Sequence, residues 1–113
     1  MTTAGQNIEV YIGDTANPVI TVTDSDGVPV NLTGYVISYR ARTYGADIVK
    51  TSTSGITVVD AVGGQFQINF LPSDTSTKKE QICKHECKIK LGATVWTVFV
   101  GELLLKGGLI ATV

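Results

Sequence analysis

The stretch DSDGVPVNLTGYVISYRAR, residues 24–42, decides the fold of this 113-residue chain. It opens with Asp-Ser-Asp-Gly, and short polar side chains followed by a glycine are typical of a tight turn. Pro29 then favours an extended backbone, because its ring fixes its own φ and keeps Val28 out of the α region. From Tyr35 onward apolar and polar residues alternate. Successive side chains of a strand point to opposite faces, so this alternation predicts a half-buried strand.

The same alternation recurs along the chain. Its clearest instance is residues 65–70, where Phe66, Ile68 and Phe70 are predicted to face inward. For residues 76–81 the pattern leaves two alternatives open, one helical turn or a loop. Seven to nine short strands, spaced by roughly 8–12 residues, predict an all-β fold, an immunoglobulin-like antiparallel β-sandwich. Further strands are predicted at residues 8–12, 19–23, 48–50, 56–59, 83–91 and 94–106.

Composition excludes several classes of protein. Apolar residues make up 43% of the chain and charged residues 17%, which excludes a disordered chain and favours a surface that a partner covers in part. Nine basic and ten acidic residues give a net charge of −1, so we expect no nucleic-acid partner. No apolar run approaches the ~18 residues of a membrane span, and the N-terminus does not resemble a secretory signal. We therefore expect no membrane partner and synthesis in a cytoplasm.

Cys83, His85 and Cys87 form the one constellation that resembles a metal site. On a strand all three side chains share a face, but Cys83 and Cys87 would lie about 13 Å apart. That separation is too long for one tetrahedral zinc and too long for a disulfide. We therefore expect two core cysteines, a histidine bonded to a neighbour, no metal and no cofactor. A helical conformation of this segment would restore the metal hypothesis through its i, i+4 spacing.

Candidate catalytic side chains are few. His85 is the only histidine, and it lies in the middle of a predicted strand, so a Ser-His-Asp site would have to be built around a core residue. We expect no catalytic residue and a protein that is not an enzyme. Arg40, Arg42 and the lysines between residues 78 and 90 are interpreted as the solvated outer side of two strands. Turn capping is the expected role of the aspartates in predicted turns, Asp14, Asp24, Asp26, Asp60 and Asp74.

Residues 94–106 are apolar on both faces, with Trp96, Val98 and Val100 predicted on one side and Phe99 on the other. Such a strand is expected to be covered twice, by its own sandwich and by another subunit or protein. We expect one domain over residues 1–106, followed by a short apolar tail, residues 107–113, that can pair with a sheet edge of a neighbour. The predicted interaction surface comprises Trp96, Val98, Val100, Leu104, Leu109, Ile110 and Val113.

Several turn and strand motifs occur in a fixed order. A first strand closes on Gly-Asp-Thr at residues 13–15, and Asp-Gly-Val-Pro-Val-Asn-Leu-Thr-Gly follows at residues 26–34. A strand after Gly64, an Asp-Thr corner at residues 74–75 and a last strand with a glycine, residues 101–105, complete the pattern.

In these motifs most of residues 7–106 resembles small immunoglobulin-like domains of tailed bacteriophages. Such domains stand at the N-terminus of baseplate upper proteins and in related tail or virion components. The chain departs from them at residues 80–83, where they often have Gly-x-Tyr before the penultimate strand.

The resemblance implies a non-enzymatic structural protein of the virion, made in the cytoplasm of the bacterial host. It would act as an assembly module in the tail, the baseplate or the head decoration. Its partners would be other virion proteins or further copies of itself, as a homo-oligomer.

Two alternatives use the same sandwich. The first is a module that binds a carbohydrate or a host receptor, with Tyr11, Tyr35 and Tyr44 as a platform for a host glycan. The second is a small phage-encoded inhibitor of a host protein, which would be a monomer.

Overall fold

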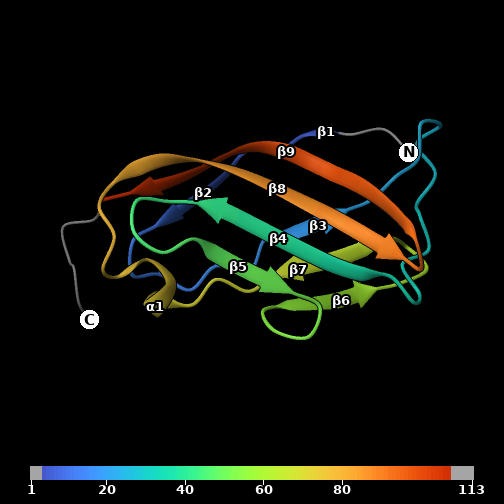
Figure 1. The fold of residues 1–113 in the computed structure, drawn as a ribbon, viewed down its shortest axis with the longest axis horizontal. Coiled ribbons are helices and arrows are strands. Elements are labelled where there is room, and N and C mark those ends of the chain that lie inside the picture. The colour runs from blue at the N-terminus through green and yellow to red at the C-terminus, as the bar shows by residue number, and fades with distance from the viewer. Residues whose placement is uncertain (1–3, 108–113) are drawn as a thin grey trace.

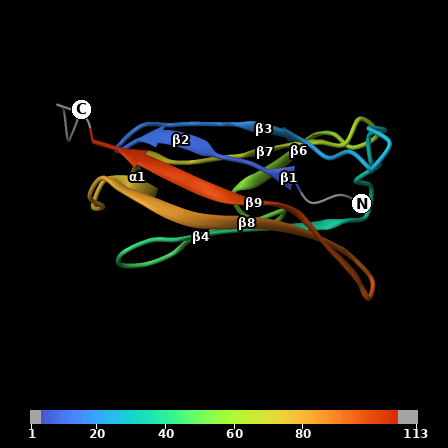
Figure 2. The same cartoon turned by 90° about the horizontal axis from the view of Figure 1, so that it is seen from above.

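Two β-sheets packed face to face make up most of the computed structural model, which describes residues 4–107 (Figure 1). A helix of one turn, α1 (Pro72–Thr75), follows β7 and precedes β8 in the sequence. Figure 2 shows the layers from the side, with β4 and β8 in one and β3 and β7 in the other. The strands are β1 (Ala4–Gly5), β2 (Ile8–Tyr11), β3 (Val19–Thr21), β4 (Val36–Arg42), β5 (Ile48–Thr51), β6 (Ile56–Asp60), β7 (Gln65–Ile68), β8 (Gln81–Leu91) and β9 (Thr94–Lys106).

The strand order identifies the type of sandwich. The six-stranded sheet has the order β1-β9-β8-β4-β5, with β2 also paired to β9, and the three-stranded sheet has the order β3-β7-β6. β1 and β2 pair with β9 in parallel, and the other strand pairs are antiparallel. These sheets correspond to the G-F-C and B-E-D sheets of an immunoglobulin-like sandwich. The predicted all-β fold of seven to nine strands is confirmed.

The core follows the predicted alternation. Every second residue of β4 is buried, and so are Phe66 and Ile68 of β7 on the facing sheet and Phe70 just after it. Aromatic rings join the two layers, because Tyr39 of β4 packs edge-on against Phe70 with ring centroids 5.8 Å apart. Burial of apolar area on this scale is the main source of stability of such a domain.

The turn that precedes β4 forms as the sequence predicts. One carboxylate oxygen of Asp24 accepts hydrogen bonds from the backbone N–H groups of Asp26 and Val28, at 2.9 and 3.0 Å. Gly27 has a φ of +80°, a conformation that residues with a Cβ rarely adopt. Asp60 caps its turn in the same way, with Gly63 N–H as the donor.

The prediction that Trp96, Val98 and Val100 share one face of β9 is wrong. A β-bulge interrupts the pairing of β9 with β8 just after Cys87. One extra residue on a strand reverses the alternation beyond it. Val98 and Phe99 are therefore both buried, whereas Val100 points outward. Val98 is 6% exposed and belongs to the core, not to a surface.

The helical turn falls earlier than residues 76–81. Pro72 begins α1, as expected for a residue without a backbone N–H, and Asp74 accepts a hydrogen bond from the N–H of Leu71. Thr75 is buried at the end of α1, where its hydroxyl oxygen accepts a hydrogen bond from Gly13 N–H at 2.9 Å. This contact attaches α1 to the loop that follows β2.

Candidate interaction surface

The outer face of the six-stranded sheet, formed by its side chains that point away from the three-stranded sheet, carries many exposed apolar residues. Ile82 of β8 is 68% exposed and pairs across the strands with Leu104 of β9, which is half-buried. The next apolar residue along β9 on this face is Val100, which is also exposed. Further exposed apolar side chains of this face are Tyr11, Val36, Val49 and Val95.

Charges of both signs lie among these apolar residues. In the strand register Lys84 pairs with Glu102 and Arg40 pairs with Glu86. The cations therefore occupy the outward positions of β4 and β8, as the sequence predicts for the solvated side of two strands. The outward cations of these two strands are Arg40, Arg42, Lys84, Lys88 and Lys90.

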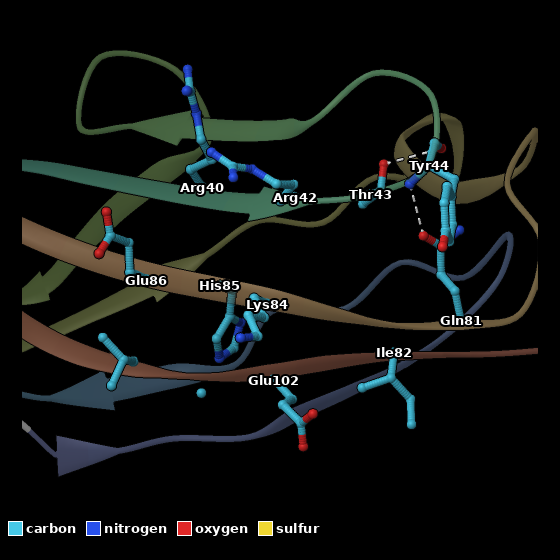
Figure 3. A pocket seen from close by; sticks show the side chains of 12 residues that line it. Arg40, Arg42, Thr43, Tyr44, Gln81, Ile82, Lys84, His85, Glu86 and Glu102 are labelled. Carbon is cyan, nitrogen blue, oxygen red and sulfur yellow. Dashed lines mark hydrogen bonds between the residues drawn. The ribbon is translucent and has the colours of Figure 1, made fainter.

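One part of the outer face is hollowed. An open depression of about 930 Å³ lies over the end of β4, the first half of β8 and the middle of β9. Figure 3 shows its lining, with the arginines of β4 on one side and Glu102 and Ile82 on the other. Gly101 contributes no side chain to the floor, so the ring of His85 also lines the depression although it belongs to the core.

His85 is held on both ring nitrogens. Nε2 lies at hydrogen-bond distance from the carbonyl oxygen of Gln6, and Nδ1 lies 2.8 Å from the hydroxyl of Tyr39. A carbonyl can only accept, so Nε2 carries the proton and Nδ1 accepts from Tyr39. Burial lowers the pKa of His85, and the hydrogen bond to Gln6 raises it by a smaller amount. The prediction that His85 is bonded to a neighbour is confirmed.

Gly101 makes the bond between Gln6 and His85 possible. β1 and β2 keep one register along β9, but residues 6 and 7 between them leave the regular strand. The amide oxygen of Asn7 accepts from Glu102 N–H at 3.0 Å. A Cβ on Gly101 would collide with the Gln6 carbonyl oxygen. The glycine therefore lets the N-terminal segment cross close over β9.

The two cysteines are core residues, as predicted. Cys83 and Cys87 are free and buried on the inner face of β8. Burial raises the pKa of the Cys87 thiol to about 12, with a smaller contribution from Glu86, and it also raises the pKa of Cys83. Both thiols are therefore protonated near neutral pH, and a protonated thiol is a poor nucleophile and metal ligand. Residues 4–107 contain no cluster of His, Cys, Asp or Glu arranged to bind a metal.

A buried ion pair was missed by the sequence pattern. Lys50 is buried on the inner side of β5, and its Nζ lies 2.7 Å from Oδ2 of Asp74. The same oxygen accepts from Leu71 N–H, so Asp74 both caps α1 and pairs with Lys50. The signal was available, since Lys50 stands two residues after Ile48, at an inward position of the alternation.

The structure separates the predicted surface residues. Val100 is exposed and Leu104 half-buried on the outer face, but Trp96 lies at the β8–β9 hairpin, where its ring stacks on Tyr35. Leu109, Ile110 and Val113 of the predicted tail lie outside the described residues.

Sequence reasoning also missed Ile82. It could have been found, because it is the one apolar residue among the outward positions of β8 between residues 82 and 90.

The three tyrosines of the glycan hypothesis come from different parts of the sandwich. Tyr35 precedes β4 and Tyr44 follows it, so the seven residues of that strand lie between them. Tyr44 is 88% exposed, whereas Tyr11 lies on β2 opposite Lys106. Stacked on Trp96, Tyr35 is not part of a flat platform with the other two.

Comparison with protein-family models and with curated proteins gives no match to this chain. Within residues 4–107 no helix has the length and hydropathy that crossing a bilayer requires.

Proposed function

We propose that this protein is a non-enzymatic structural component of a tailed-phage virion, an assembly module of the tail, the baseplate or the head decoration. The observation that carries the proposal is the outer face of the six-stranded sheet. There, exposed Ile82 and Val100 lie among charges of both signs. Interfaces between proteins combine apolar side chains and complementary charges on one surface. The turn motifs resemble those of immunoglobulin-like domains of tailed bacteriophages, and this resemblance suggests the virion as the place where such a surface is used.

The interior supports the same proposal. His85 is bonded through both ring nitrogens, and Lys50 is paired with Asp74. Each of these groups already has the partners that its chemistry requires, within the fold. A general acid or base must instead present a free position to its substrate. These side chains therefore stabilise the sandwich, and the outer surface is what the molecule offers to other molecules.

The composition of purified particles tests the proposal. Virions of the phage or prophage that encodes the chain are purified, and their proteins are quantified by mass spectrometry. We expect the chain at a fixed ratio to the products of neighbouring tail, baseplate or head genes. Its absence from intact particles would overturn the proposal.

Two further measurements separate the alternatives. A glycan array with reproducible hits, from a chain absent from particles, would favour a carbohydrate-binding module. A monomer that captures one bacterial protein from a host lysate, and that is absent from particles, would favour an inhibitor. Neither result is expected from a protein that acts through virion assembly.

A further inference from the structure

We propose that the outer face of the six-stranded sheet is the contact of a homodimer, in which β8 of one copy packs over β9 of a second copy. The two-fold axis runs parallel to these strands, in the plane between the two packed sheets, and lies above the line midway between β8 and β9. This inference rests on the assembly role proposed above and names its partner, a second copy of this chain. The register of β8 against β9 carries it.

Two neighbouring pairs of that register are self-complementary. Ile82 pairs with Leu104, and at the next outward position Lys84 pairs with Glu102. A two-fold axis between the strands exchanges the members of each pair. Ile82 of one copy then faces Leu104 of the other, and Lys84 faces Glu102. Each contact occurs twice, as in every isologous interface.

The remaining outward residues of β8 meet no like charge across this axis. Lys88 would face Thr97, whereas Glu86 and Lys90 would face Val100 and Val95, their partners in the register. The outward side chains of β4 would lie over β1 and β2 of the second copy, on the far side of β9. An axis between β8 and β4 would instead place Lys84 against Arg42, since these two pair in the register. That axis would also bring Arg40 against Glu86. Like charges in contact destabilise an interface, and only the axis between β8 and β9 brings no like charges of its two central strands together.

The area is adequate for a specific dimer. β8 has 11 residues, which span about 36 Å, and the axis superposes β8 on β9 along this length. β4 overlaps β1 and β2 over only a few residues, and β5 lies outside the overlap. Each partner therefore contributes roughly 500 Å², so the two together reach the ~1,000 Å² of a specific interface. Sheets of the same twist also pack face to face with nearly aligned strands, which is the arrangement that this axis produces.

Charge reversal followed by mixing tests the contact. Light scattering on the wild-type chain is expected to give twice the monomer mass, and Lys84→Glu and Glu102→Lys are each expected to give the monomer mass. In a mixture of the two variants, the introduced glutamate of one faces the introduced lysine of the other, so the dimer mass returns. The double variant Lys84→Glu with Glu102→Lys is likewise expected to dimerise. Restoration by mixing cannot come from a role of either residue within one chain.

A second pair of variants keeps the test independent of the charges. Ile82→Asp is expected to give a monomer, whereas Val19→Asp, at an exposed position on β3 of the opposite sheet, is expected to leave the dimer intact. Circular dichroism confirms that each variant is folded. If a charge reversal does not fold, Glu102→Gln mixed with the wild type replaces it and is expected to weaken the dimer.

The proposal is overturned by a wild-type monomer, by a mixture that stays monomeric, or by equal effects of Ile82→Asp and Val19→Asp. A chain that dimerises but is absent from virions would overturn the proposed function alone. A chain present in virions that binds another virion protein as a monomer would overturn the dimer alone.

Discussion

His85 connects three parts of the chain through its two ring nitrogens. It lies on β8, accepts a hydrogen bond from Tyr39 of β4 and donates one to Gln6 of the N-terminal segment. Its ring also packs against Phe99, with centroids 5.1 Å apart. A neutral imidazole suits this arrangement, because protonation would put a second donor against the Tyr39 hydroxyl and a charge into the core.

Stability is therefore expected to depend on pH through His85. Its pKa is lowered from the ordinary value of 6.5 in the folded chain, so below that pH the unfolded chain binds more protons at this residue. The free energy of unfolding then decreases as the pH falls below about 6.5, and the full contribution of His85 is present above it. Urea unfolding between about pH 7.5 and about pH 5 measures this slope.

His85→Gln is the control, because glutamine keeps a donor for the Gln6 carbonyl and does not titrate in this range. In the variant, the decrease of the free energy of unfolding that begins near pH 6.5 is expected to disappear. An unchanged slope would mean that other groups cause the pH dependence.

The pair of Lys50 and Asp74 predicts unequal effects of two substitutions. Asp74→Ala leaves a buried ammonium without a partner and removes the acceptor of Leu71 N–H, so we expect a loss of about 3 kcal/mol. Lys50→Met fills the same space with an apolar chain and leaves Asp74 partly exposed, so its loss is expected to be about 1 kcal/mol or less. Chemical denaturation of the two variants measures both values. Equal losses would show that the ion pair itself, not the unpaired charge, dominates.

At the scale of the element, the position of the N-terminal segment depends on Gly101 of β9, which has no side chain. β1 and β2 pair in parallel with β9, and they meet over Gly101, where the chain needs room to bring Gln6 toward His85. Ile8 and Val10 are buried by this pairing, so β2 closes one side of the core.

Gly101→Ala is expected to loosen that segment. The new Cβ meets the Gln6 carbonyl, so the backbone has to shift and the bond to His85 weakens. We expect a loss of about 1–3 kcal/mol, as for other overpacked sites, and faster hydrogen exchange in residues 4–11. Gly45→Ala is a poor control because its φ is positive, whereas Ala93→Gly in the hairpin turn leaves this site untouched. Because the loss of global stability also accelerates exchange at β6, the local effect is the additional acceleration in residues 4–11, and its absence would contradict the prediction.

At the scale of the whole molecule, the two sheets share one core. β2, near the start of the chain, pairs with β9, near its end, so the six-stranded sheet is complete only when the whole domain has folded. Tyr39 and Phe70 join the sheets through their rings. A core shared by both layers favours a single cooperative unfolding transition.

The lone tryptophan of the chain tests this cooperativity. Trp96 stacks on Tyr35 at the β8–β9 hairpin, so its fluorescence reports on that end of the six-stranded sheet. The urea midpoint from fluorescence is expected to coincide with the midpoint from far-ultraviolet circular dichroism, which reports on all strands. Gly101→Ala is expected to move both midpoints together. A fluorescence transition at lower urea would show that the hairpin melts separately.

Local pattern was sufficient for most of the fold. Alternation of side chains placed β4, β7 and β8, and the turn residues between 24 and 34 placed the corners, because these features depend on neighbours in the sequence. The spacing of Cys83 and Cys87 along a strand also predicted correctly that they form no disulfide, and the alternation predicted that both are buried. The basic residues of β4 and β8 were correctly placed on the outer face of the sheet.

What the sequence by itself determined, then, is the set of strands and which side of most of them is buried, since a period of two is a local property. Tertiary structure alone decided the bulge that buries Val98, the partners of His85 and the role of Gly101. It also decided that Ile82 and Lys84 stand beside Leu104 and Glu102, which is the basis of the proposed dimer. Each of these depends on the register between segments far apart in the chain, and register is set when the two layers pack together.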